Sequence, residues 1–443
     1  MELRTFTRLA AALTAGVVAA AALAGCAGTG GSSSADGDQT LTIWTWPSAG
    51  ELLAPTITAF EKDNPGAKVD VVDVGNPAIW EKITTSLAAG GEGLPDIMTV
   101  GIDYLPGYTD KFKNAFADLS TLGADDLKAD FAPSAWGGGL GSDGQIWGIP
   151  FEVNTSGFVY NKSLFDKAGI DVSTIKTWDE LIEAGVTLKK KTGASLFELD
   201  KAAAKSASAD IWQTLTQQQD SFYFNADGEI TMNNAAGVKS LELLKKANDL
   251  GVLADAASFT AGGASQYADG SVATNIDASW WAGYFEDAQP AQAGKWAVAL
   301  RPAVEEGGTT AALAGSTYLS IAGNSEHKEL AWKFINFALG SLDGQKAMQT
   351  AHPFTPGLTA MYSTDGFTDG SGFYVGKSPS QVFVDSITQP NLAVPNFTSD
   401  YARAIKIYTD AQTKVLLTGA DPQEALDKAA QLLADATGRK IAE

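Results

Sequence analysis

Residues 40–101 read TLTIWTWPSAGELLAPTITAFEKDNPGAKVDVVDVGNPAIWEKITTSLAAGGEGLPDIMTVG, and this stretch decides the fold. Short β-branched runs, typical of strands, alternate with segments whose apolar residues recur at helical spacing. The runs and segments follow in the order strand 40–46, helix 51–64, strand 68–75, helix 76–89 and strand 95–101. This alternation predicts a mainly parallel sheet covered by helices on both faces, which is an α/β lobe.

The same kinds of segment continue to the end of the chain. Thr177 and Glu180 have the S/T-x-x-E spacing of a capping box, which predicts a helix through Lys191. Further strands are expected at 144–162, 271–281, 296–302 and 317–323, and further helices at 235–250, 326–339, 401–417 and 421–437. A chain of 443 residues is longer than one hydrophobic core usually supports, so we expect at least two lobes.

Composition excludes several classes of function. The formal net charge of -21 disfavours nucleic acid as a partner, because an acidic surface repels phosphate. The two histidines, His327 and His352, have no partners at metal-ligand spacing, so no metal site is expected. Nucleophile-elbow, Walker A and dinucleotide motifs are also missing, and no cofactor is expected.

The N-terminus has the pattern of an export signal. A positive start is followed by an apolar run, and residues 23–26 read LAGC, with Cys26 the only cysteine. LAGC matches the bacterial lipobox, which implies a lipoprotein signal peptide over 1–25 and acylation of Cys26. Gly- and Ser-rich residues 26–38 would then form a flexible tether, and the lipid would be the only contact with a membrane. A cleaved signal followed by a free cysteine is the alternative.

Aromatic residues gather near the ends of expected strands. Trp46 closes the first strand, Asp103 and Tyr104 follow the third, and Trp280 and Trp281 follow a later one. Ligands of open α/β sheets bind beyond the carboxyl ends of the strands. Aromatic faces cover the C–H faces of sugars, and Asp and Asn side chains pair with sugar hydroxyls. The cluster therefore favours a neutral, polyhydroxylated ligand, although tryptophans are more often core residues.

Six motifs in this order carry a family resemblance: LTIWTW, FEKDNPGAKV, LPDIMTV, GQIWGIPFEVNTSGFVYNKSLFDKAGI with TWDEL, YADGSVATNIDASWW, and HKELAWKFINFAL. Together they resemble the family 1 extracellular solute-binding proteins of ABC importers, the maltose-binding-protein-like group. The resemblance covers about residues 40–440. It implies an α/β, two-lobe, type II periplasmic-binding-protein-like fold whose hinge the chain crosses about three times.

The resemblance also implies where the lobes divide. Crossings are expected near 150–153, 293–296 and 350–353. Lobe one would then consist of 38–152 and 296–349, and lobe two of 153–295 and 350–443. A ligand held in the cleft between the lobes would draw them together in a hinge motion.

The positions that match the family cleft are ligand-binding candidates. They are Trp46, Ser48, Asn76, Asp103, Tyr104, Asn154, Asp277, Trp280, Trp281, Gly315, Ser316, Asp400 and Tyr401. Two of them depart from the family pattern, since Tyr104 stands where an arginine can occur and Asp400 intrudes near a late aromatic position. Residues 198–220 align ambiguously and carry no prediction.

The expected function is that of a non-enzymatic, monomeric binding protein. It would capture a mono- to oligosaccharide and deliver it to a membrane-embedded ABC permease. If Asp103, Asp277 and Asp400 converged without aromatic cover, a polyamine or another small cation would be favoured instead. A lipid-anchored glycoside hydrolase would need two carboxyl groups facing each other across a cleft. A surface adhesin or sensor partner is the remaining alternative.

Overall fold

The computed structural model describes residues 39–141, 143–202, 209–256, 261–276 and 278–443. These residues fall within one unit of the chain, Asp38–Glu443. The expected signal peptide, the tether with Cys26, and Asp277 lie outside the described residues.

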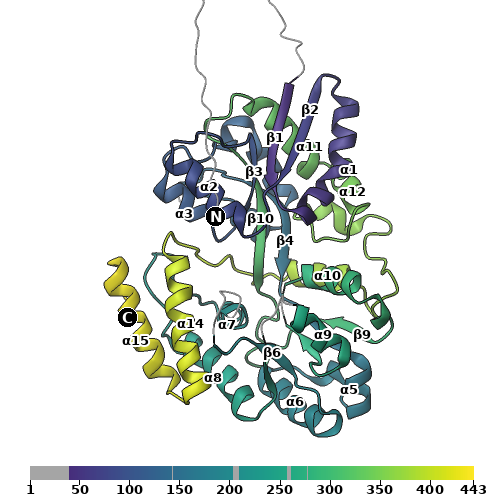
Figure 1. Ribbon diagram of the computed structural model, residues 1–443, viewed down its shortest axis with the longest axis vertical. Coiled ribbons are helices and arrows are strands. Elements are labelled where there is room, and N and C mark those ends of the chain that lie inside the picture. Colours follow the sequence, from purple (N-terminus) through teal and green to yellow (C-terminus); the bar gives the residue numbers. More distant parts are fainter. Residues whose placement is uncertain (1–38, 142, 203–208, 257–260, 277) are drawn as a thin grey trace, which may run out of the picture. The chain divides into compact units, whose positions relative to one another are not determined.

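The first sheet has five strands in the order β2-β1-β3-β10-β4 (Figure 1). Its members are β1 (Gln39–Thr45), β2 (Ala67–Asp73), β3 (Ile97–Gly101), β4 (Ile149–Thr155) and β10 (Leu313–Ile321). β1 pairs in parallel with both β2 and β3, as the alternation of strands and helices predicts. β10 is antiparallel to β3 and to β4, and Figure 1 shows β10 and β4 side by side.

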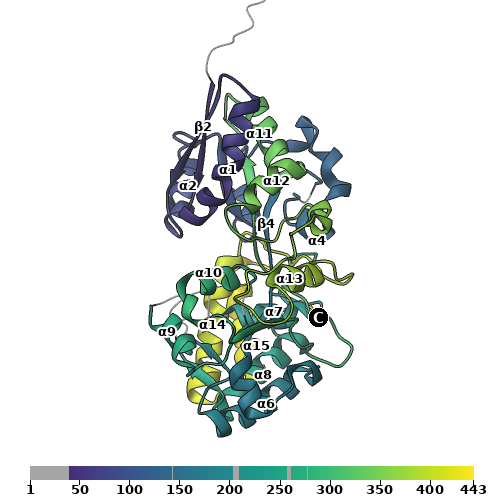
Figure 2. The ribbon, with the colours of Figure 1, turned by 90° about the vertical axis from the view of Figure 1, so that its right-hand side faces the viewer.

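Helices cover both faces of this sheet. On one face, Ile43 belongs to a buried cluster with Phe60 of α1 (Pro47–Asp63) and Phe334 of α11 (Lys328–Gly340). α12 (Leu342–Gln349) packs beside α1 and α11, as Figure 2 shows. On the other face, Trp44 is buried with residues of α2 (Ala78–Ala88) and α3 (Leu105–Lys111). Successive residues of β1 thus enter different cores, as strand geometry requires.

A second group of strands follows in the chain. β5 (Phe158–Asn161) lies between β8 (Thr274–Asn275) and β9 (Trp296–Ala299), antiparallel to both. β6 (Phe197–Leu199) and β7 (Leu253–Asp255) form a separate parallel pair. The remaining α-helices are α4 (Pro133–Gly137), α5 (Lys162–Ala168), α6 (Trp178–Thr192), α7 (Asp210–Gln217), α8 (Ala235–Asp249), α9 (Ala261–Asp269), α10 (Trp280–Ala288), α13 (Pro379–Ile387), α14 (Tyr401–Thr418) and α15 (Pro422–Thr437). Short 3₁₀ turns occupy Leu119–Leu122, Ala124–Asp130, Val172–Thr174, Pro290–Gln292 and Thr359–Ser363.

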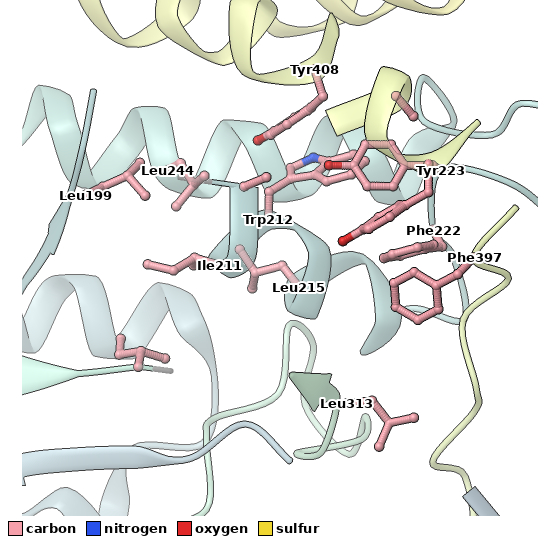
Figure 3. Packing of buried hydrophobic residues seen from close by; sticks show 14 of the residues in the cluster. Leu199, Ile211, Trp212, Leu215, Phe222, Tyr223, Leu244, Leu313, Phe397 and Tyr408 are labelled. Carbon is pink, nitrogen blue, oxygen red and sulfur yellow. The ribbon is translucent and has the colours of Figure 1, made fainter. Parts of the chain in front are cut away.

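An aromatic core joins the last helices of the chain to this second group. Trp212 of α7 stacks on Tyr408 of α14, with ring centroids 4.1 Å apart and an interplanar angle of 26° (Figure 3). Tyr223 packs against Trp212 at 4.9 Å. The indole Nε1 of Trp212 donates a hydrogen bond to the carbonyl of Gly237 at 2.9 Å, so this buried polar group is satisfied. The C-terminal helices therefore share a core with α7 and α8.

Two of the expected crossings between the lobes lie elsewhere. Trp296–Ala299 was assigned to lobe one, but it forms β9 and pairs with β5. The return to the first sheet therefore comes between β9 and β10. The crossing expected near 350–353 is also misplaced, because Phe367 is still buried in the core with Ile43, whereas Phe373 packs with Trp296. Segment 354–367 has few strand or helix cues, and the strand predicted at 296–302 does not reveal from its sequence which sheet it joins, so only pairing and packing assign the two segments.

None of the helices in the described part of the chain is both long and apolar enough to cross a membrane.

The capping box at the start of α6 is present as expected. Thr177 Oγ1 accepts a hydrogen bond from the Glu180 backbone N–H at 3.3 Å. In return, the Glu180 carboxylate accepts hydrogen bonds from the backbone N–H groups of Thr177 at 3.0 Å and Lys176 at 2.6 Å. These contacts satisfy donors that the first turn of a helix otherwise leaves without partners.

Thr177→Ala should lower the free energy of unfolding by about 1 kcal/mol, because it removes the acceptor of the N-cap. Urea unfolding followed by circular dichroism measures the change. Thr58→Ala, at a residue inside α1, is the matched control and should be neutral or slightly stabilising, since Ala is a better helix former. Equal losses in both variants would contradict the role of the cap.

Candidate functional site

Four aromatic side chains follow the carboxyl ends of β1, β2 and β3. They lie either shortly after a strand or in the helix that comes next. We call Trp46, Trp80, Tyr104 and Tyr108 the aromatic wall. Trp46 directly follows β1, Trp80 is in the first turn of α2, and Tyr104 precedes α3. Trp46 and Trp80 are 5.8 Å apart at 61°, Trp80 and Tyr104 are stacked at 4.3 Å and 13°, and Tyr104 and Tyr108 are 5.9 Å apart. The carboxyl edge of a parallel sheet is the usual ligand position in α/β folds.

Hydrogen bonds hold the wall in place. Trp80 Nε1 donates to Asn76 Oδ1 at 3.1 Å, and the Tyr108 hydroxyl donates to the Trp80 carbonyl at 3.0 Å. Trp46, Trp80 and Tyr104 are half-buried, so part of each ring remains accessible. The structure thus brings the predicted residues Trp46, Asn76 and Tyr104 together through Trp80. Sequence reasoning treated Trp80 only as part of a helix, although its position one turn after the end of a strand was a usable clue.

Asp103 lies at the end of the wall, beside Tyr104. Its pKa is raised from 3.8 to about 6, because burial disfavours the charged carboxylate. Burial raises the pKa of Tyr108 to about 12, and the negative charge of Asp103 adds to the effect. Burial, followed by the charge of Asp103, also raises the pKa of Tyr401, the first residue of α14. Two predicted residues from distant parts of the sequence therefore lie near each other.

Tyr401 is linked to a residue that the sequence did not reveal. Its hydroxyl donates to Gln213 Oε1 at 2.7 Å, and both side chains are buried. The Gln213 Nε2 group has no hydrogen-bond partner among the described residues. Leaving a buried donor without a partner costs about 1–3 kcal/mol, a cost that a ligand oxygen at this position would remove. Gln213 falls in the region 198–220, which carried no prediction.

A second set of polar groups surrounds β4. Asn154 Oδ1 accepts a hydrogen bond from Ser279 Oγ at 2.8 Å, and the Asn154 backbone N–H donates to Ser316 Oγ at 3.4 Å. Gly315 has a φ of 87°, a left-handed conformation that glycine adopts without strain. Burial raises the pKa of Glu152 to about 7, against a lowering by its hydrogen bond with Asn154. Asn154 and Ser316 are thus in direct contact, and Gly315 precedes Ser316 in β10.

Trp280 lines a small cavity together with Glu152 and Ser279. It begins α10, is 38% exposed, and lies 6.3 Å from Tyr284. The cavity has a volume of about 60 Å³, and its lining includes Glu152, Ser279 and Trp280. An exposed indole beside hydroxyl and carboxyl groups suits a ligand with both apolar and polar faces.

Two predicted site residues have other roles. Trp281 is only 3% exposed and stacks on Phe285 at 4.6 Å and 11°, so it is a core residue. Asp400 forms ion pairs with Arg439 at 2.8 Å and Arg403 at 3.8 Å. Its charge is therefore compensated within the protein. A polyamine would require Asp103, Asp277 and Asp400 to converge without aromatic cover. Asp277 lies outside the described residues, and Asp103 lies directly beside Tyr104 of the aromatic wall, so nothing in the described structure supports this alternative.

Two further predicted residues need separate mention. Ser48 lies exposed in the first turn of α1, two residues after Trp46. Asp277 belongs to the predicted site but lies outside the described residues. Across the described ranges, no three His, Cys, Asp or Glu side chains are grouped so that they could hold a metal ion.

The most voluminous of the cavities found near these elements does not contain the predicted residues. It measures about 980 Å³, and its lining includes Leu105 of α3, Trp147, Phe222, Asn225 and Asn396. None of Trp46, Trp80, Asp103, Asn154 and Trp280 lines it. We therefore assign the candidate site to the half-buried rings of the aromatic wall, to Asp103 beside them, and to Tyr401 with its partner Gln213.

Comparison with known sequences identifies the family. Residues 44–345 match the model of the bacterial extracellular solute-binding proteins, which is more than half of the chain. The chain belongs to that family. The arabinooligosaccharide-binding protein of Bacillus subtilis (strain 168) is 28% identical over 373 residues, covering 80% of this chain and 83% of the relative. The lactose-binding protein of Rhizobium radiobacter is 27% identical over 379 residues, covering 82% and 86%.

Solved structures confirm the type II periplasmic-binding-protein fold of this family member. The GacH receptor of Streptomyces glaucescens GLA.O has a TM-score of 0.75 at 20% identity, covering 90% of this chain and 99% of that one. The sugar-binding protein MalE of Xanthomonas citri has a TM-score of 0.76 at 22% identity, with 90% and 97% covered. At these identities the likeness shows the fold, which has two α/β lobes.

Asp103→Asn should stabilise the protein at neutral pH. The folded state raises the pKa of Asp103 from 3.8 to about 6, so folding favours the protonated form and stability falls as the pH rises through that range. The variant cannot ionise and avoids this loss. Its urea midpoint should exceed that of the wild type at pH 7.5, and the difference should shrink below pH 4. Asp70→Asn, at an exposed position of β2, is the control. A difference independent of pH would contradict the assignment.

Proposed function

We propose that this solute-binding protein captures a carbohydrate at the aromatic wall and the residues that face it. The observation that carries the proposal is the position of Asp103, which lies beside the stacked Trp80–Tyr104 pair and near Tyr401. Two relatives are named for binding arabinooligosaccharides and lactose, which supports a sugar as the ligand.

The chemistry of these groups suits a neutral sugar. Indole and phenol faces cover the apolar C–H faces of the rings, while carboxylate and amide groups exchange hydrogen bonds with hydroxyls. Asp103 supplies an acceptor, and the unpartnered Nε2 of Gln213 supplies a donor. Asp400, the residue before Tyr401, forms an ion pair with Arg439, so its negative charge does not call for a cationic ligand. The glycoside hydrolase alternative receives no support from the relatives, which are named as binding proteins.

Binding draws the lobes together in this proposal. Asp103 and the aromatic wall belong to the first sheet and its helices, whereas Trp280 and Tyr401 begin α10 and α14. A ligand that contacts both groups at once lowers the free energy of the closed state only, and this differential contact drives closure. The closed, loaded monomer then delivers the sugar to an ABC permease. Lobe one would comprise 39–155, 313–349 and the segment 354–367, and lobe two most of the remainder.

The export pattern supplies the location. We propose that residues 1–25 are removed and that Cys26 carries the lipid at the outer face of the membrane. The polar tether then leaves the folded part free to meet the permease. An acylated cysteine with more than one chain provides the stable anchoring that a single chain does not.

A thermal-shift screen tests the proposed ligand class. A solute that binds only the folded state raises the unfolding temperature, and the rise grows with the logarithm of its concentration relative to its dissociation constant. We expect a shift with arabinose- or galactose-containing sugars and none with spermidine. Titration calorimetry then gives the affinity, and chromatography of the sugar after incubation checks that it is not cleaved. A shift with spermidine alone, or cleavage of the sugar, would overturn the proposal.

Trp280→Ala should weaken binding of the sugar found in that screen by about 1–3 kcal/mol, because it removes a large aromatic face. The substitution should perturb folding little, since Trp280 is 38% exposed. Trp332→Ala is the matched control, as Trp332 of α11 is half-buried against the opposite face of the first sheet. Titration calorimetry measures both. An unchanged affinity in Trp280→Ala would remove Trp280 from the site.

A further inference from the structure

Glutamine side chains fasten the segment between β9 and β10 to the helices of lobe two. Gln218, the residue after α7, donates hydrogen bonds through Nε2 to the carbonyls of Pro302 at 3.1 Å and Thr309 at 3.0 Å. Gln389, which follows α13, accepts hydrogen bonds through Oε1 from the Thr309 hydroxyl at 3.2 Å and the Thr310 backbone N–H at 3.3 Å. The chain that leads into β10 is therefore held at two points before it reaches the first sheet.

Gln217, the last residue of α7, makes the next contact with both ends of its amide. Its Oε1 accepts a hydrogen bond from the Leu313 backbone N–H at 2.9 Å, and its Nε2 donates to the Leu313 carbonyl at 2.9 Å. We call this pair of hydrogen bonds the Gln217 clamp. β3 pairs with β10 only over Thr317–Ile321, so the buried amide of Gln217 takes the place of a neighbouring strand at Leu313.

The strand is irregular immediately after the clamp. The register of β10 against β4 shifts between Leu313 and Ser316. Gly315, inside this interval, has a φ of 87°, and apart from its chain neighbours no heavy atom lies within 4 Å of the place where a Cβ would be. A few residues at the end of an element, without close packing, are the usual place for a hinge to absorb backbone rotation. From Thr317 onward, pairing with β3 makes β10 regular again.

We propose that Gln217 is a positioning residue for lobe closure, because it fixes Leu313 to lobe two and confines the bending of β10 to residues 314–316. This inference rests on the proposed function, in which a bound solute draws the lobes together. Trp212 of α7 and Leu313 belong to one buried cluster, so the clamp moves with the core of lobe two (Figure 3). The boundary of lobe one within β10 then lies after Leu313.

Loss of the clamp changes the cost of closure. Without it, Leu313 and the segment before it gain conformational freedom in the open state, and closure has to remove that freedom again. The fraction of molecules that can close on a solute falls, and the apparent affinity falls by the same factor. A residue that only stabilises α7 would lower the stability of the fold without this effect on closure.

Gln217→Met tests the clamp, because Met has a similar length but cannot pair with the Leu313 backbone. Gln219→Met is the matched control. Gln219 Nε2 also donates hydrogen bonds, but all its acceptors belong to α7 or α8 within lobe two. Both variants should lower the urea midpoint, since each leaves hydrogen-bonding groups without partners. Only Gln217→Met should act on the hinge.

The spread of distances between the lobes measures hinge freedom without any ligand. Spin labels on cysteines introduced at the exposed positions Lys62 of α1 and Glu242 of α8, in a Cys26→Ser background, report that spread by pulsed electron resonance. Gln217→Met should broaden the distance distribution, whereas Gln219→Met should keep the wild-type width. An unchanged width in Gln217→Met, or equal broadening in both variants, would overturn the inference. If Gln217→Met fails to fold, Gln217→Glu, which keeps the acceptor but loses the donor, decides by the same criterion.

Calorimetry with lactose and arabinotriose tests the consequence for binding. The dissociation constant of the sugar that binds should rise by about tenfold in Gln217→Met, the factor that the loss of two ordinary hydrogen bonds can supply. It should stay at the wild-type value in Gln219→Met. An unchanged affinity in Gln217→Met would contradict a role in closure. If neither sugar binds to the wild type, the proposed carbohydrate function fails, and the distance distributions still decide whether Gln217 confines the hinge.

Discussion

The parallel pairing of β1 with β2 and β3 is the constraint on which the candidate site depends. Because all three strands run in one direction, their carboxyl ends meet at one edge, and the residues after them become neighbours despite their separation in sequence. Trp46, Trp80 and Tyr104 come together for this reason alone. A register shift of one residue in β1 would exchange Ile43 and Trp44 between two cores, so burial of these side chains also fixes the position of Trp46.

The antiparallel pair β10–β4 supplies what the parallel strands cannot. These strands pair with each other over Leu313–Leu319, and their register shifts twice in that interval. The irregular part holds Gly315, Ser316 and Asn154. Here the Asn154 backbone N–H donates to Ser316 Oγ, and the Asn154 side-chain oxygen accepts from Ser279 Oγ at the start of α10. The second of these bonds connects the first sheet with the helix that holds Trp280.

Local patterns were enough to predict the α/β alternation around the first sheet, and the family resemblance implied the two-lobe fold, but contacts distant in sequence decided the site. The alternation over 40–101 and the capping box of Thr177 depend on neighbouring residues, and both were predicted correctly. Trp280 and Trp281 show the limit of such patterns. Adjacent residues on a helix point about 100° apart, so only one of them enters the core, and the sequence does not say which. Likewise, the pairing of Asp400 with Arg439, which lies 39 residues later, leaves no local trace.

Three groups of the candidate site are held in states that folding alone does not favour. Burial raises the pKa values of Asp103 and Glu152, so their ionised forms oppose folding at neutral pH, and the Nε2 donor of Gln213 is buried without a partner. Each could be replaced by a residue that packs better, and selection for stability would favour that change. Asp103 lies beside the aromatic wall and Glu152 lines the cavity with Trp280, and the presence of the three groups is explained if a ligand supplies the missing partners. The same ligand must then reach from the wall to α7 and α14, which is the condition for closing the lobes.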